Sequence, residues 1–163
     1  PTWDPDGSRV AVALQPTGWS FFYFGAGSKL EREEPMKDLE APNRFWPLSW
    51  SPDGRRLAGL VIGLDGLASA IATYEIASSH YERVFTRDGA SWIAPVWLGD
   101  SRRLLIRDRE GVHLVDPAAG LSRRILDVTG YYIGRSLGVT GDDRWITYTE
   151  TATDGDIWLM TLE

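Results

Sequence analysis

The stretch that decides the fold is Trp50-Ser-Pro-Asp-Gly-Arg-Arg-Leu57, and versions of it occur at two other places in the 163-residue chain. These are Trp3-Asp-Pro-Asp-Gly-Ser-Arg-Val10 and Trp97-Leu-Gly-Asp-Ser-Arg-Arg-Leu104, so that each tryptophan follows the previous one after 47 residues. A weaker fourth copy is Val139-Thr-Gly-Asp-Asp-Arg-Trp-Ile146, with a shorter step of 42 residues between the aspartates. A period of about 40 to 50 residues is typical of proteins built from repeated supersecondary units.

The repeated phrase has the composition of a tight turn between two strands. Proline presets φ, aspartate accepts hydrogen bonds from backbone N–H groups two residues further on, and glycine adopts positive φ. Ser101 and Asp143 replace this glycine in the third and fourth copies. We interpret the repeated tryptophans as wedges between neighbouring units and the other positions as turn formers. The structural repeat residues are Trp3, Asp6, Gly7, Trp50, Asp53, Gly54, Trp97, Asp100 and Asp142.

Short runs rich in β-branched and aromatic residues lie between the turns, without a long helical period. Four such strands every 40–50 residues or so indicate the blade of a β-propeller. We predict an all-β fold, a single β-propeller domain over residues 1–163 with four-stranded antiparallel blades. The expected blades span about 1–38, 39–88, 89–129 and 130–163. Residues 29–39, rich in Glu and Lys, are expected to form an irregular outer strand or a surface turn of helix.

The strand count gives about three and a half blades, whereas propellers have about four to eight. An open arc exposes sheet edges and apolar blade faces. Three arrangements resolve this. The chain is the C-terminal part of a larger propeller, two copies form a homodimer that closes one ring, or the chain curls into a small ring alone. We favour the first as the biological arrangement.

The longer phrase Pro47-Leu-Ser-Trp-Ser-Pro-Asp-Gly-Arg-Arg-Leu57 resembles the WD40-like Pro-Asp repeat of TolB-type propellers, and residues 112–116 and 156–160 fit a later strand of it. The resemblance covers essentially the whole chain. It implies a bacterial protein, with a periplasmic or other extracytoplasmic location favoured slightly over the cytoplasm. Similar repeats form sensor regions of membrane-anchored Ser/Thr kinases, TolB itself and the propellers of prolyl-oligopeptidase-like enzymes, so the resemblance specifies the fold rather than one function.

Patterns for catalysis are weak. Gly134-Arg-Ser-Leu-Gly138 matches the nucleophile elbow of α/β-hydrolases, but that elbow needs a helix after Ser136, and a turn and strand are expected here. His80 and His113 also precede Ser136, whereas the hydrolase histidine follows its serine. We interpret His80 as a solvated turn residue and His113 as an outward strand position. We therefore expect no catalytic residue and no enzymatic activity.

Patterns for metal binding are equally weak. The chain has no cysteine and only two isolated histidines, which disfavours a transition-metal site. The acidic segments 65–66 and 154–156 have too few oxygen ligands at set spacing for a calcium loop, and hairpin turns explain them better. We therefore expect neither a metal nor a cofactor.

Composition limits the partners. The net charge of −6 disfavours nucleic-acid binding, which needs clustered Lys and Arg, and no apolar run is long enough for membrane insertion. We predict a non-catalytic binding module for a protein or peptide, with an accessory propeller of a prolyl-oligopeptidase-like hydrolase as the alternative. The candidate binding face, on the side opposite the Asp-Gly turns, comprises Trp19, Arg44, Asp65, Arg109, Tyr131, Tyr132 and Asp154. Trp19 and Tyr131 have an alternative role in packing between blades.

Overall fold

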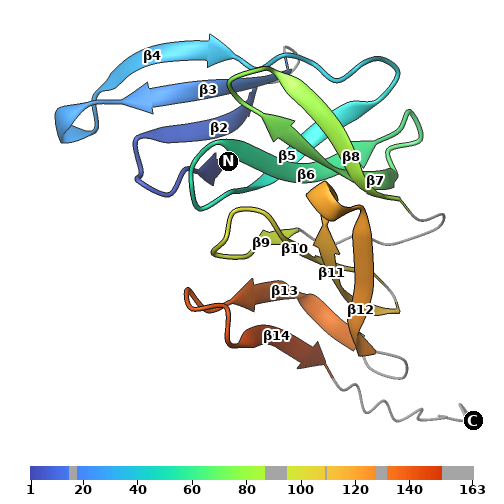
Figure 1. The fold of residues 1–163 in the computed structure, drawn as a ribbon. Coiled ribbons are helices and arrows are strands. Elements are labelled where there is room, and N and C mark those ends of the chain that lie inside the picture. Colours follow the sequence, from blue (N-terminus) through green and yellow to red (C-terminus); the bar gives the residue numbers. More distant parts are fainter. Residues whose placement is uncertain (15–17, 87–94, 109, 128–131, 152–163) are drawn as a thin grey trace, which may run out of the picture.

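The computed structural model describes residues 1–14, 18–86, 95–108, 110–127 and 132–151, which form a series of antiparallel sheets (Figure 1). The first sheet contains β1 (Thr2–Trp3), β2 (Arg9–Leu14), β3 (Gly18–Phe24) and β4 (Leu30–Pro35). The second contains β5 (Arg44–Trp50), β6 (Arg56–Ile62), β7 (Ala68–Glu75) and β8 (His80–Thr86). The third contains β9 (Val96–Trp97), β10 (Leu104–Arg107), β11 (Gly111–Asp116) and β12 (Leu121–Asp127). The last described sheet pairs β13 (Tyr132–Val139) with β14 (Ile146–Thr151).

Each sheet is a meander in which sequence neighbours pair, so the predicted all-β propeller architecture is confirmed. The first strands of the four sheets, β1, β5, β9 and β13, lie next to one another in turn. The described sheets follow one another as an open arc (Figure 1). The segment expected as an outer strand or a helical turn is the exposed strand β4. Short 3-10 turns occur at Ala26–Ser28 and Pro117–Ala119.

The repeated turns share one hydrogen-bond pattern. The Oδ1 atoms of Asp6, Asp53, Asp100 and Asp142 accept backbone N–H groups two residues ahead, at 2.8, 3.1, 2.9 and 3.2 Å. The residue after each aspartate has positive φ. The values are 74° at Gly7, 69° at Gly54, 56° at Ser101 and 57° at Asp143. Serine and aspartate thus adopt the left-handed conformation that glycine adopts without a Cβ penalty.

Alternation along each second strand produces a core on both of its faces. Leu57 lies in the cluster between the first and second sheets, and its neighbour Ala58 lies in the cluster between the second and third. A third cluster around Leu105 joins the third sheet to β13 through Leu137 and Val139. The apolar core of this chain is therefore divided among the contacts between successive sheets.

The repeated tryptophans occupy different environments. Trp50 and Trp97 are 7 % and 4 % exposed, and each packs in the cluster shared with the preceding sheet. Trp50 also donates from Nε1 to the carbonyl of Thr2, at 2.9 Å. Trp3 is 54 % exposed because the described chain has no sheet on its preceding side. The wedge position predicted for Trp3 is therefore not occupied within the described arc.

Arginines connect each sheet to the turn of the next. The Arg9 guanidinium lies 4.9 Å from the Trp50 ring centroid, and its Nη2 donates to the Gly54 carbonyl at 2.9 Å. Arg9 Nε is fixed by the buried Asp4 carboxylate, 2.8 Å away. In the second sheet, Arg56 likewise stacks on Trp97 and donates to the Ser101 carbonyl. These cation–π contacts repeat with the 47-residue period.

Candidate binding surface

The residues predicted for the binding face are only partly brought together by the fold. Trp19 lies on β3 and is partly buried, Arg44 begins β5 and is exposed, and Asp65 lies in the exposed hairpin between β6 and β7. Tyr132 begins β13, and its side chain is outside the described part. Arg109, Tyr131 and Asp154 also lie outside the described residues.

The centre of the candidate surface is a pair of tryptophans from two sheets. The ring centroids of Trp19 and Trp46 are 6.0 Å apart in an edge-on arrangement. Trp46 is 51 % exposed, whereas Trp19 also packs against the core between the first two sheets. Trp19 therefore packs between two sheets, which is its alternative role, and also contacts an exposed indole, while its part in binding stays a prediction.

Trp46 was missed by the sequence reasoning, although a signal for it was present. Along β5 the side chains alternate, with Arg44 exposed, Phe45 buried, Trp46 exposed and Pro47 buried. Alternation in a half-buried strand predicts this pattern. The run Arg-Phe-Trp-Pro contains three apolar residues in sequence, which hid the outward position of the middle one.

Two leucines extend the exposed apolar surface beside Arg44. Arg44 pairs with Ile62, the last residue of β6, and the hairpin that follows exposes Leu64 and Leu67. Asp65 Oδ1 accepts the Leu67 N–H at 3.0 Å, so its carboxylate shapes this hairpin. We define the Trp19–Trp46 surface as Trp19, Arg44, Trp46, Leu64 and Leu67.

The strands beneath this surface are held by buried contacts. The backbone N–H of Met36 donates to the Trp19 carbonyl at 2.8 Å. Phe45 packs edge-on against Tyr81 with ring centroids 5.2 Å apart, and the Tyr81 hydroxyl donates to the Lys37 carbonyl. Burial raises the pKa of the Tyr81 hydroxyl, so it remains a neutral donor. Trp46 therefore projects from a strand whose opposite side is packed against the core.

The outward position predicted for His113 is wrong. Its side chain is buried, with the ring centroid 5.2 Å from that of Phe85 in the preceding sheet. His113 Nε2 lies 3.2 Å from Oδ2 of the buried Asp108. Polarity favoured an outward histidine, but β11 packs against the second sheet and the Asp108 carboxylate offers a buried partner. His80 is exposed, as predicted, but it begins strand β8 instead of lying in the turn.

The surroundings of Asp108 explain why a carboxylate is stable at this buried place. Burial by itself would raise the pKa of Asp108. Hydrogen bonds from the N–H groups of Glu110 and Gly111, at 2.8 and 3.0 Å, together with His113, hold the pKa below its ordinary value. The Asp108–His113 pair is therefore part of the packing between the second and third sheets.

The local geometry does not favour a nucleophile elbow at Ser136. This residue lies within strand β13, and the strand β14 follows after the fourth repeat turn. An elbow requires a sharp turn with the serine at its apex, followed by a helix.

Within the described ranges, no group of three His, Cys, Asp or Glu side chains is placed to hold a metal ion. Searching those same ranges also finds no helix long and apolar enough to cross a membrane.

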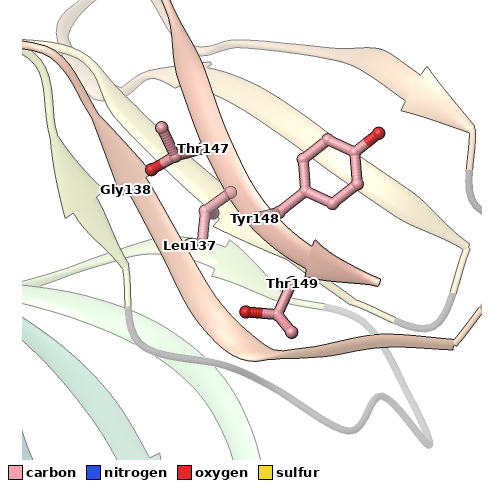
Figure 2. A pocket seen from close by; sticks show the side chains of 5 residues that line it. All are labelled: Leu137, Gly138, Thr147, Tyr148 and Thr149. Carbon is pink, nitrogen blue, oxygen red and sulfur yellow. The ribbon is translucent and has the colours of Figure 1, made fainter. Parts of the chain in front are cut away.

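A hollow of about 270 Å³ lies on the last described sheet (Figure 2). Leu137 and Gly138 of β13 and Thr147, Tyr148 and Thr149 of β14 line it. Gly138 and Thr147 are paired across the two strands. The hollow carries no charged or nucleophilic cluster, and its position at the end of the arc is its main feature.

Comparison with known proteins gives the fold class. No protein-family model and no curated protein matches the chain. Among solved structures, TolB from Acinetobacter baumannii matches with a TM-score of 0.62 and 16% identity, over 91% of this chain and 36% of that one. A putative TolB from Agrobacterium tumefaciens matches with a TM-score of 0.68 and 18% identity, over 94% of this chain and 54% of that one.

An enzyme is also among the structural neighbours. A puromycin hydrolase mutant complexed with PGG matches with a TM-score of 0.58 and 16% identity, over 86% of this chain and 23% of that one. At these identities the likeness concerns the fold. The chain has a TolB-like β-propeller fold, and it spans about a third to a half of the length of the two TolB chains.

Proposed function

We propose that the chain is a non-catalytic propeller module that binds a protein or peptide through the Trp19–Trp46 surface. The observation that carries this proposal is the half-exposed Trp46 on β5, in contact with Trp19 of the first sheet. A large apolar side chain that is exposed on the surface leaves water only when a partner covers it, and exposed apolar patches commonly mark interaction sites. Trp and Arg are the residue types that most often dominate binding energy.

The chemistry of the surface favours a peptide segment with an apolar side chain and a carboxylate. Trp46 and Leu67 offer apolar contact area, and Arg44 offers a fork of N–H donors that matches a carboxylate. The net charge of −6 disfavours nucleic acid as the partner. Neither a cofactor nor insertion into a membrane is part of the proposed role.

We place this module in a larger bacterial protein that acts outside the cytoplasm. The likeness to TolB structures and the partial coverage of those chains support such a setting. A sensor region of a Ser/Thr kinase or a TolB-like envelope protein fits a propeller whose role is recognition. The identity of the larger protein is a separate matter from the binding surface itself.

The test is a selection of displayed random peptides on the immobilised chain, followed by affinity measurement for the best peptides. We expect Trp46→Ala to weaken binding by about thirtyfold or more, the loss of a hot-spot residue, without a change in melting temperature. Leu121→Ala, at an exposed position of the outer strand β12, is the matched control and should bind like the wild type. Peptides that bind Trp46→Ala as tightly as the wild type would refute the proposed surface.

A further inference from the structure

The contacts inside the chain show how one sheet receives the tryptophan of the next. Trp50 shares a buried cluster with Ala11 of the first sheet, and Trp97 shares one with Ala58 of the second. The two alanines hold the same place in the repeat, two residues after the arginine that stacks on the incoming indole. A small side chain at this place leaves room for the indole.

The last described sheet presents the same place on the face that no other described sheet covers. Thr147 is equivalent to Ala58, and Trp145 takes the place of the stacking arginine and is 67 % exposed. Alternation along β14 puts Thr147 and Thr149 on one face, and Trp145 directly precedes the strand. Leu137, which pairs with Tyr148, packs with the third sheet. The hollow in Figure 2 opens beside Thr147 and its strand partner Gly138. Its lining by Gly138 and Thr147 puts it beside the place where the first and second sheets receive a tryptophan.

The first sheet presents the complementary part at the other end of the arc. Trp3 holds the same repeat position as Trp50 and Trp97, yet it is exposed. Among the described rings it contacts only Phe24 of the same sheet, with ring centroids 5.4 Å apart. The Asp6–Gly7 turn beside it has the same geometry as the turns that the preceding arginines contact elsewhere. The first and last described sheets thus carry the two halves of an inter-sheet contact.

We propose that a second copy of this chain joins the arc head to tail, with Trp3 of each copy seated in the hollow beside Gly138 and Thr147 of the other. Trp145 then stacks on the incoming Trp3 where Arg9 stacks on Trp50. Two such contacts close a ring with twofold symmetry. This gives the predicted homodimer a specific contact, independent of the Trp19–Trp46 surface.

The turns predict a second contact at the same interface. Pro5 Cδ lies 3.9 Å from the position of a Cβ added at Gly54 in the next turn, and Gly99 N–H donates to the Asp143 carboxylate of the following turn at 2.8 Å. The residues of each turn are counted from the first residue of the repeated phrase, which is Trp3, Trp50, Trp97 or Val139. In both cases the third residue of one turn then meets the fifth residue of the next. Between copies, the same relation places Gly141 of one copy beside Gly7 of the other.

The first experiment measures solution mass by light scattering over a range of concentrations. The wild type should approach twice 18.2 kDa, and Trp3→Ala and Thr147→Tyr, which remove the indole and fill the hollow, should weaken dimerisation tenfold or more. Trp46→Ala removes an equally exposed tryptophan away from both ends and should leave the mass unchanged. A wild type that stays monomeric at its highest soluble concentration, or a Trp3→Ala variant that dimerises like the wild type, would overturn the proposal.

The second experiment traps the contact, using the absence of cysteine in the chain. Gly7→Cys and Gly141→Cys each place a side chain where no atom lies within 4 Å, and Ser101 shows that a side chain is tolerated at the positive φ of the Gly7 position. Mixing the two variants under oxidation should give a disulfide-linked dimer. Neither variant alone should give this dimer, and neither should a mixture of Leu64→Cys with Gly141→Cys. A monomeric internal disulfide in the Gly7→Cys, Gly141→Cys double variant would show instead that the chain closes on itself.

Discussion

Replacing each repeated tryptophan by alanine tests how the sheets are held together. Trp50→Ala removes an indole whose ring centroid lies 5.8 Å from that of Phe21. The same indole stacks on the Arg9 guanidinium and donates a hydrogen bond to the Thr2 carbonyl. Truncating a buried tryptophan costs about 3–5 kcal/mol, so we expect a loss of about 4 kcal/mol in the free energy of unfolding. Trp97→Ala should cost about as much, since Trp97 is equally buried. Trp3→Ala, more than half exposed, should cost about 1 kcal/mol or less.

The assay is urea unfolding followed by far-ultraviolet circular dichroism, at a dilution where light scattering shows a monomer. With a slope of about 2 kcal/mol per molar urea, a loss of about 4 kcal/mol moves the midpoint by about 2 M. If Trp50→Ala does not fold, Trp50→Phe keeps a ring in the core, loses the hydrogen bond to Thr2 and should cost about 1–2 kcal/mol. Equal losses for Trp3→Ala and Trp97→Ala would refute the wedge interpretation, because the two side chains differ mainly in burial.

Two further measurements test the turns and the buried polar pair. Gly54→Val puts a β-branched residue at a φ of 69° and should lower stability by about 1–2 kcal/mol in the same urea assay. Pro52→Ala in the same turn, at an exposed position, should change stability less, and equal effects would contradict the conformational argument. The folded-state pKa of Asp108 lies below its ordinary 3.8, so its contribution to stability is present above that pH and is lost as the pH falls through the folded value. Melting temperatures at pH 7 and pH 3 should therefore differ less for Asp108→Asn than for the wild type, and an unchanged difference would contradict the assigned hydrogen bonds.

The burial of His113 shows where a polar residue can be placed by its neighbours rather than by its own character. Its strand β11 packs against the second sheet, and Phe85 and Asp108 provide an aromatic contact and a carboxylate at the same point. A buried polar group is stable when it has a partner. No motif in the sequence predicts this role for Asp108, and the β10–β11 hairpin brings it to His113.

The sequence by itself determined the repeated unit and its turns. The Asp-Gly phrase specifies positive φ and a side-chain hydrogen bond within a few residues, so local chemistry was sufficient to predict it. Alternating apolar strands between such turns then define four-stranded blades, and the all-β propeller fold follows from the period. Residues such as Asp53 and Gly54 could be interpreted without knowledge of their distant neighbours.

The tertiary structure alone decided which side of each strand is covered and by what. Trp3 and Trp50 have the same local sequence signal, but only Trp50 has a preceding sheet against it. Trp46 meets Trp19 because two sheets adjoin, and the hollow at Gly138 and Thr147 lies on the last sheet of the described residues, which no further described sheet covers. Burial depends on contacts between residues far apart in the chain, which a local pattern of residue types does not encode.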